Sequence, residues 1–412
     1  MDGSSSTLDV ARLGQVFTPA SVVEFMLGLR RKHGRVLEPA CGDGAFLSRM
    51  PGALGIELDP ALCPARAKRM DFFAFPDAEK FDTIIGNPPY VRFQDIPAET
   101  RARLHGAGLD GRSNLYLFFI EKCVRHLLPG GELIFVTPRG FLKSTSALRL
   151  NRRLWELGTI SHAVELGDHR VFDGALPNCL IWRFERSDFS RMTRFLDASR
   201  EASLDGALAH PRWESRHFTE CAGHLLFTRG EYPLSLSQVF SVRVGAVSGE
   251  DAIFADEANG NRDFVCSSTA RTGATRRMIW CPEAPHPALL PHRDRLLARR
   301  IRRFDESNWW CWGRGYRESR RPRIYVNCKT RSPRPFFLHP CVHYDGSVMA
   351  LFPHDEGADL HALCECLNDL DWADLGFLCH GRYLFSQRSL ENAPLPERWR
   401  AFVREERVKS LV

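Results

Sequence analysis

The pattern of hydrophobic and polar positions predicts an α/β fold for the first half of the chain. Up to about residue 185, short β-rich runs alternate with stretches of helical periodicity, which is typical of βαβ units around a doubly wound, mostly parallel sheet. The last two runs are too close in sequence for a crossover helix, so we expect an antiparallel strand at that end of the sheet. The predicted strands are 35–38, 53–57, 81–86, 132–137, 162–166 and 179–184.

Helical periodicity is clearest after Ser113. Apolar residues from Leu115 to Leu127 recur at helical spacing, and the turn-forming residues Pro129–Gly131 end the pattern before the next strand. A second helix is predicted over 141–154. Both helices lie between predicted strands, as the crossover segments of βαβ units do.

The pattern changes after the last of these strands. Periodicity weakens there, and residues 206–213 are interpreted as a connecting segment. We place the domain boundary near Pro233, which gives a first domain of residues 1–235 and a second domain of residues 236–412. The second domain mixes short strands with Gly, Pro and Arg, so we expect a mixed α+β structure.

Composition narrows the class of protein. A chain of 412 residues with 44% hydrophobic residues is long enough for two domains and a sizeable core. Apolar stretches fall short of the ~20 residues of a membrane span, and the N-terminus lacks the features of a signal peptide, so we expect a cytoplasmic protein that contacts no membrane. The thirteen cysteines include no C-x-x-C pair, which favours reduced packing residues and predicts no metal.

Positive charge is concentrated in one window of the second domain. The net charge of the chain is +6, but residues 271–340 alone hold 17 Lys and Arg against 5 Asp and Glu. Tryptophans and tyrosines are interleaved with these arginines, which suits phosphate contacts combined with groove or base contacts. The alternative is a small tryptophan core under a solvated arginine face. We interpret the window as DNA-binding, with Arg314, Arg317, Arg320, Arg321 and Arg323 as candidate contacts.

A Gly-rich turn follows the first predicted strand. The segment 38–44, Glu-Pro-Ala-Cys-Gly-Asp-Gly, leads into a helix expected from Ala45. Its glycines let the backbone at Cys41 and Gly42 approach a ligand closely. Leu47 stands where a dinucleotide-binding motif has its third glycine, so a dehydrogenase is disfavoured.

Two acidic residues extend this candidate site. Glu57 ends the next predicted strand, where a carboxylate can accept hydrogen bonds from both hydroxyls of a ribose. Asp71 is followed by two phenylalanines, so its carboxylate can accept a hydrogen bond from an adenine amine while an aromatic ring covers the base. Together with the turn, they predict a pocket for a ligand that contains adenosine.

The segment Asn87–Tyr90, Asn-Pro-Pro-Tyr, follows the strand predicted at 81–86, and ligands of open α/β sheets bind at such strand ends. The N6 lone pair of adenine is delocalised into the ring, so it must be localised before it can attack a sulfonium methyl. The Asn87 side-chain oxygen and the Pro88 carbonyl can accept both N6 hydrogens, and Tyr90 offers a stacking face. Positioning then replaces a general base, and the adenine must be rotated out of a duplex.

Together these motifs resemble the gamma-class amino-methyltransferases of bacterial restriction and modification systems. The resemblance is close over residues 10–185 and loose over 236–254. It implies a Rossmann-like methyltransferase domain with a seven-stranded sheet, S-adenosylmethionine as cofactor and a C-terminal target recognition domain. The segments that carry it are Gly14–Pro19, Glu38–Gly44, Glu57, Asp71, Asn87–Tyr90, Asn114–Glu121, Pro129–Gly131, Val171–Phe172 and Leu180–Ile181.

The resemblance also implies roles for individual residues. Asn87, Pro88 and Tyr90 hold the adenine, with Phe172 on its other face. Thr18 contacts the cofactor, although by sequence alone Thr18 and Pro19 would form an N-cap and first-turn pair for a helix from Ala20. The residues implied to line the cofactor pocket are Thr18, Glu38, Ala40, Glu57, Leu58, Asp71, Phe72 and Pro89.

The sequence therefore predicts a site-specific DNA methyltransferase that acts on N6 of a flipped adenine in duplex DNA. The alternatives are methylation of RNA or a protein glutamine, methylation of cytosine N4, and an inactive DNA-binding relative. The N-terminal motif and the basic second domain argue against methylation of RNA or protein. Asn87 at the start of the tetrapeptide argues against methylation of cytosine N4. The intact tetrapeptide argues against an inactive relative. The expected partners are double-stranded DNA and, as a candidate, a cognate restriction endonuclease encoded separately; we expect a monomer.

Overall fold

The chain divides into two compact units, residues 1–230 and residues 231–412. Each unit has its own apolar clusters. Among the residues that the structure describes, no helix is long and apolar enough to cross a membrane. The computed structural model describes residues 16–104, 109, 113–167, 169, 178–221, 223–316, 318–379 and 381–403.

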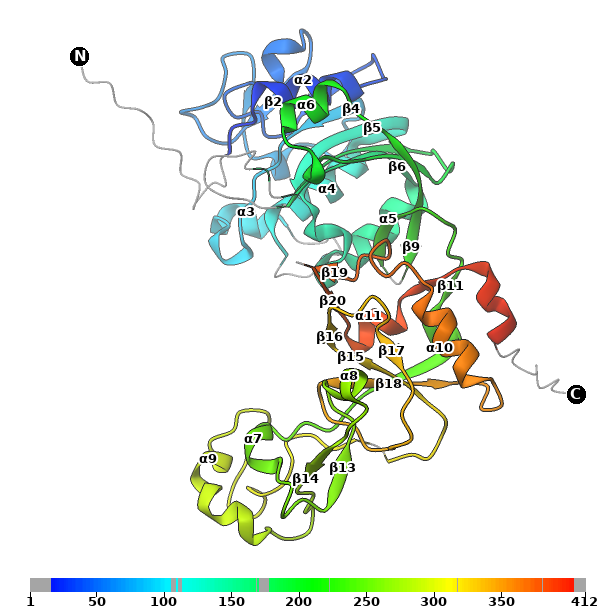
Figure 1. Ribbon diagram of the computed structural model, residues 1–412. Coiled ribbons are helices and arrows are strands. Elements are labelled where there is room, and N and C mark those ends of the chain that lie inside the picture. The colour runs from blue at the N-terminus through cyan, green and yellow to red at the C-terminus, as the bar shows by residue number, and fades with distance from the viewer. Residues whose placement is uncertain are drawn as a thin grey trace, which may run out of the picture. The chain divides into compact units, whose positions relative to one another are not determined.

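A sheet of ten strands, counted over the described residues, forms the centre of the first unit (Figure 1). The strand order is β10-β9-β8-β6-β7-β5-β4-β1-β2-β3. The strands from β3 to β5 in this order are parallel, and β7 lies antiparallel between β5 and β6. The strands are β1 Val36–Glu38, β2 Leu54–Glu57, β3 Lys68–Arg69, β4 Phe81–Gly86, β5 Leu127–Pro138, β6 Gly158–Gly167, β7 Cys179–Arg186, β8 Met192–Asp197, β9 Glu214–Cys221 and β10 His224–Thr228.

Helices cover both faces of this sheet (Figure 1). Successive side chains of a strand point to opposite faces, so Leu133 and Phe135 of β5 pack in the cluster that includes α4 and α5, whereas Ile134 and Val136 pack with α2 and α6. The α/β, doubly wound class predicted from the sequence is therefore confirmed. The helices are α2 Ala20–Leu29, α3 Ala98–Arg103, α4 Leu115–His126, α5 Leu148–Leu157 and α6 Leu204–Ala209.

The sheet is wider than predicted. The antiparallel strand β7 is confirmed, but the number of strands is ten among the described residues, where seven were expected. The strand β3 has only two residues, both exposed, and β8 mixes exposed and buried positions, so neither gives a clear hydrophobic run. The segment predicted as a connection over 206–213 contains most of helix α6.

Two predicted helices also differ. In place of a helix from Ala45, the chain makes turns and a short 3₁₀ helix, Leu47–Arg49, which Pro51 and Gly52 follow closely. Helix α5 begins only at Leu148, because the backbone at Ser144 is extended, with a ψ of 144°, and interrupts the helix that was expected from Phe141.

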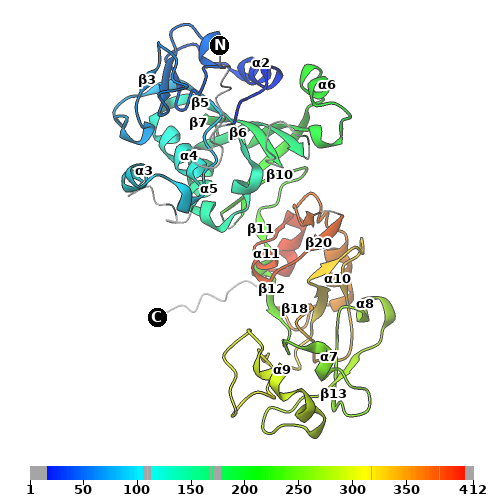
Figure 2. The ribbon, with the colours of Figure 1, turned by 90° about the vertical axis from the view of Figure 1, so that its left-hand side faces the viewer.

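The second unit has a four-stranded sheet, in the order β12-β18-β15-β17, with α10 and α11 beside it, while α7, α9 and β13 gather at one end of the unit (Figure 2). Each part has its own apolar cluster. The elements are β11 Leu234–Ser235, β12 Phe240–Val244, α7 Asp251–Phe254, β13 Arg262–Phe264, α8 Thr269–Thr272, β14 Arg276–Met278, α9 Arg293–Leu297, β15 Ile324–Asn327, β16 Lys329–Thr330, β17 Phe336–Phe337, β18 Val348–Pro353, α10 Leu360–Asn368, β19 Leu378–Cys379, β20 Arg382–Leu384, α11 Gln387–Glu391 and β21 Pro394–Leu395.

Candidate active site

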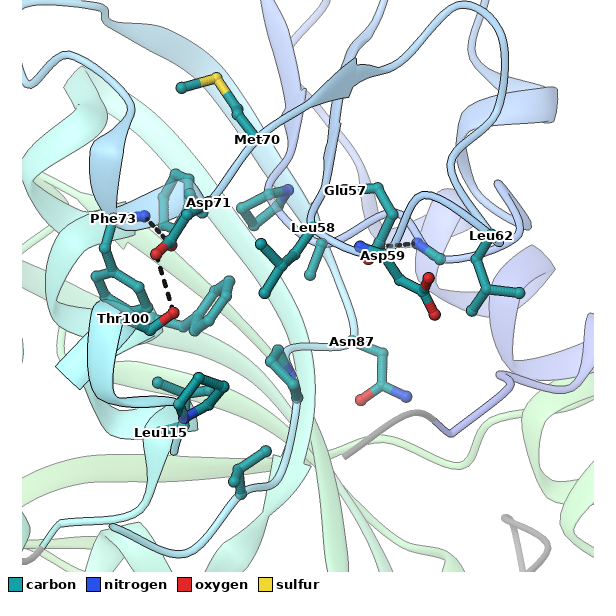
Figure 3. A pocket seen from close by; sticks show the side chains of 18 of the residues that line it. Glu57, Leu58, Asp59, Leu62, Met70, Asp71, Phe73, Asn87, Thr100 and Leu115 are labelled. Carbon is teal, nitrogen blue, oxygen red and sulfur yellow. Dashed lines mark hydrogen bonds between the residues drawn. The ribbon is translucent and has the colours of Figure 1, made fainter. Parts of the chain in front are cut away.

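A pocket in the first unit lies at the carboxyl ends of the parallel strands β1, β2 and β4 (Figure 3). Ligands of open α/β sheets bind at this edge. Asn87 lines the pocket together with residues that the sequence analysis assigned to the cofactor. Those residues are Ala40, Gly42, Glu57, Leu58, Asp71, Phe72 and Pro89.

The other predicted site residues lie beside this lining or outside the described residues. Thr18 is hydrogen-bonded to Asn87. Glu38 and Cys41 are buried next to lining residues in the chain, and Pro88 and Tyr90 belong to the tetrapeptide itself. The prediction for Phe172 falls outside the described residues.

Glu57 connects the end of β2 to the Gly-rich turn. Its Oε2 accepts a hydrogen bond from the backbone N–H of Gly42 at 2.7 Å, and its Oε1 accepts one from the N–H of Asp59 at 2.8 Å. Gly42 has a φ of 52°, in the left-handed region that glycine adopts without steric cost. Each carboxylate oxygen keeps a second lone pair, so Glu57 is fixed in place and can still accept hydrogen bonds from two hydroxyls.

Glu38 ends β1 directly before the lining residues Pro39 and Ala40. Its side chain is 2% exposed, and within the described structure its Oε2 has no hydrogen-bond partner. Burial raises the pKa of this carboxyl well above its ordinary value of 4.5. A buried carboxyl oxygen that lacks a partner and lies next to the pocket lining fits a ligand that carries a positive charge, because such a ligand favours the ionised form.

We expect Glu38→Gln to stabilise the protein and weaken its cofactor binding. Below pH 4.5 the carboxyl is protonated in both the folded and the unfolded protein, so its burial costs nothing extra. As the pH rises from 4.5 through the raised folded-state pKa, only the unfolded chain releases the proton readily, and stability falls. The Tm of the variant should therefore exceed that of the wild type by an amount that is smallest near pH 4.5 and grows as the pH rises. Thermal melts across this range check the prediction, and a pH-independent difference would contradict it.

Asn87 follows β4, and its amide is oriented by the N-terminal segment. Its Nδ2 donates to the carbonyl of Val16 at 3.3 Å and to the hydroxyl of Thr18 at 3.2 Å. Thr18 therefore does not act as the N-cap of α2: Pro19 holds that position, and α2 has no side-chain cap. Because the NH₂ group faces residues 16–18, the side-chain oxygen Oδ1 must point the other way.

The hydroxyl of Tyr90 lies between two acceptors, Asn87 Oδ1 and the carbonyl of Val136 at 2.7 Å. Burial raises the pKa of Tyr90 well above its usual range, so the hydroxyl keeps its proton. A phenol has a single proton and donates to one acceptor at a time. Asn87 Oδ1 can therefore be released to another donor while Tyr90 remains hydrogen-bonded to Val136.

Several residues that line the pocket were missed from the sequence. Leu115 and Phe119 were interpreted only as the apolar face of a helix, because periodicity does not separate a core face from a pocket wall. Thr100 carried no sequence signal at all. The missed residues that matter most for the geometry are Phe17, Asp59, Leu62, Thr100, Leu115 and Phe119.

In the second unit two tryptophans of the basic window are buried, whereas three of the candidate arginines are exposed. Trp309 and Trp312 are buried in the cluster with Phe254 and Phe264, so for these two the interpretation as core residues holds. Arg314, Arg320 and Arg321 are exposed, and Arg321 pairs with Glu356 at 2.6 Å. Arg317 lies outside the described residues.

The structure removes Arg323 from the candidate DNA contacts. The residue is 5% exposed, and its guanidinium donates to the backbone carbonyls of Ser319, Arg321 and Val342. Its role is to hold this loop together, because its donors already have partners within the fold. The exposed arginines of the window remain candidates.

Comparison with known proteins finds sequences that are similar to part of this chain. Residues 64–172, which include the Asn87–Tyr90 tetrapeptide, match the family model described as Eco57I restriction-modification methylase. The Type II methyltransferase M.TthHB8I of Thermus thermophilus is 37% identical over 196 residues, which cover 42% of this chain and 45% of that protein. Part of the chain is thus similar to restriction-modification methyltransferases. The resemblance expected from the sequence motifs is confirmed.

One further sequence relative and one solved structure are also similar to this chain. The Type II methyltransferase M.HincII of Haemophilus influenzae is 29% identical over 185 residues, 42% of this chain and 37% of that protein. The solved structure of the Type IIL restriction-modification enzyme MmeI in complex with DNA shares the fold, with a TM-score of 0.53 and 14% identity over 91% of this chain and 64% of that one. The chain spans less than half the length of the two curated relatives named above.

Proposed function

We propose that the protein is a site-specific DNA methyltransferase that transfers a methyl group from S-adenosylmethionine to N6 of an adenine flipped out of duplex DNA. It acts as the modification component of a restriction-modification system. The observation that carries the proposal is that Asn87 lines the same pocket as Glu57 and Gly42. In this proposal, one cavity holds both Asn87, which binds the target amine, and Glu57, which binds the ribose of the cofactor.

The residues of the pocket fit this cofactor. Glu57 offers acceptors for the ribose hydroxyls, Glu38 offers a buried carboxylate for the positive charge, and Leu58 and Phe72 offer apolar contacts for the base. When bound, S-adenosylmethionine supplies an electrophilic methyl group on a sulfonium. The sequence relatives named above are methyltransferases and support the same chemistry.

Asn87 and Pro88 prepare the amine for attack. The side-chain oxygen of Asn87 and the carbonyl of Pro88 accept the two N6 hydrogens, so the lone pair is withdrawn from conjugation with the ring. The bonds of the Asn87 amide to residues 16–18 point this oxygen away from the N-terminal segment. The Tyr90 hydroxyl then donates to Val136 and releases the Asn87 oxygen. Catalysis comes from fixed polar groups and from orientation, and the methylated amine loses its proton after the attack.

A direct assay tests the proposed substrate class. Purified protein is incubated with methyl-labelled S-adenosylmethionine and, in parallel, with mixed-sequence duplex DNA, RNA or protein. Label in duplex DNA supports the proposal, and long-read mapping of modified bases then gives the recognised site. Label in RNA or protein alone, or DNA binding with no transfer to any substrate, refutes it.

The second unit is proposed to be the target recognition domain, with exposed arginines of residues 271–340 at the DNA backbone. We expect Arg320→Ala to weaken binding to a mixed-sequence duplex and to lower the slope of log K against log salt by about 0.9, because each phosphate contact releases condensed counterions. Arg400→Ala is the matched control, since Arg400 is exposed but paired with Glu397. An unchanged slope for the Arg320 variant removes that residue from the interface.

A further inference from the structure

The carboxylate of Asp71 is held by three donors from two separate elements. Its Oδ1 accepts a hydrogen bond from the backbone N–H of Phe73 at 2.8 Å. Its Oδ2 accepts one from the Thr100 hydroxyl at 2.9 Å and one from Arg103 Nη1 at 3.1 Å. Thr100 and Arg103 both belong to helix α3, which follows the catalytic tetrapeptide in the chain. Figure 3 shows the bonds from Phe73 and Thr100 to Asp71 at the side of the pocket.

Helix α3 contributes to a wall of this pocket. Pro97, which precedes the helix, and Thr100 both line it together with Asp71. Thr100 is 6% exposed, and the side chain of Asp71 is 10% exposed, so the bond between them is shielded from water. Hydrogen bonds to a charged partner in such a setting are stronger and more directional than those at the surface.

The positions of the three donors determine which lone pair of the Asp71 carboxylate can accept a hydrogen bond from a ligand. A carboxylate oxygen has two acceptor sites in its plane. Thr100 and Arg103 occupy both sites of Oδ2, whereas Phe73 occupies one site of Oδ1. Among the described residues, one acceptor site of Oδ1 therefore has no donor, and its direction is fixed by residues of α3 on the opposite oxygen.

We propose that Thr100 and Arg103 are positioning residues that aim Asp71 at the exocyclic amine of the cofactor's adenine and so make the pocket selective for a 6-amino purine. The inference rests on the proposed function. An amine donates to the open site of Oδ1. A 6-oxo purine presents a carbonyl oxygen there, and two acceptors that face each other cannot form a hydrogen bond.

Calorimetric titration with two stable ligands tests this selectivity. S-adenosylhomocysteine carries the amine, and S-inosylhomocysteine carries an oxo group at the same position. The wild type should bind the adenosyl compound at least about tenfold more tightly, as expected for a hydrogen bond to a charged acceptor. Thr100→Val and Arg103→Met should each weaken binding of the adenosyl compound several-fold and leave the affinity for the inosyl compound unchanged. Thr100→Ser, which keeps the hydroxyl, should retain the wild-type ratio.

The controls separate aiming from packing. Glu99→Gln removes the other ion-pair partner of Arg103, at 2.9 Å, without touching Asp71, and should leave both affinities unchanged. If Thr100→Val and Arg103→Met weaken the two ligands equally while their melting temperatures stay near that of the wild type, α3 is only a wall and the inference is overturned, although the proposed function stands. If the wild type binds neither ligand, the proposed function fails and the inference with it.

Discussion

Replacing Asn87 by alanine is expected to lower kcat by about 10²–10³-fold, the cost of removing one preorganised polar group that acts on the reacting atoms. The affinity for S-adenosylmethionine should change much less, because the pocket keeps Glu57 and its bonds to Gly42 and Asp59. Single-turnover rates and calorimetric Kd values, measured on the same preparations, check this split between chemistry and binding.

The N-terminal segment requires a separate control, because the Asn87 amide also anchors Val16 and Thr18. Thr18→Val removes one acceptor of that amide but leaves the Asn87 oxygen in place. We expect its kcat to fall far less than that of Asn87→Ala. Equal losses of kcat and affinity in Asn87→Ala would mean that the residue only shapes the pocket.

Replacing Glu57 by alanine is expected to raise the Kd for S-adenosylmethionine by about 10–100-fold, since hydrogen bonds to a charged acceptor contribute about 1.5–3 kcal/mol each. The N–H groups of Gly42 and Asp59 lose their acceptor as well, so the melting temperature should also fall. Calorimetry and thermal melts measure the two effects.

Asp43 offers a matched control for Glu57. It lies in the same turn and is exposed, and among the described residues its side chain accepts a local bond from the N–H of Ala45 at 3.2 Å. Asp43→Asn should leave the cofactor affinity unchanged. A Glu57→Ala protein that melts early but binds the cofactor as tightly as the wild type would limit Glu57 to a structural role.

The sequence predicted the parts of the fold that depend on strong, local patterns. Continuous apolar runs located β4 and β5, and the Gly-rich turn and the tetrapeptide fell at strand ends as expected. Weak patterns failed: β3 is too short for a period, and β8 and β9 carry mixed exposure that resembles loop sequence. The helix expected from Ala45 failed because Pro51 follows too soon.

Contacts between distant segments explain the remaining differences. Thr18 has the sequence of a helix cap, but its hydroxyl meets Asn87, sixty-nine residues away along the chain. Thr100 belongs to no sequence motif. Its importance depends on the hydrogen bond to Asp71, which forms only when the fold brings the two residues together. Arg323 looked like its exposed neighbours, and only burial and three carbonyl partners distinguish it. Local sequence carries no information on such partners.

The most direct test of the central claim is mass spectrometry of nucleosides from duplex DNA that the purified protein has modified with deuteriomethyl S-adenosylmethionine. The account predicts deuterated N6-methyldeoxyadenosine with the wild type and a severe loss of this product with Asn87→Ala. Deuterium in N4-methyldeoxycytidine, or unmodified DNA from a wild-type protein that binds both cofactor and duplex, would contradict it.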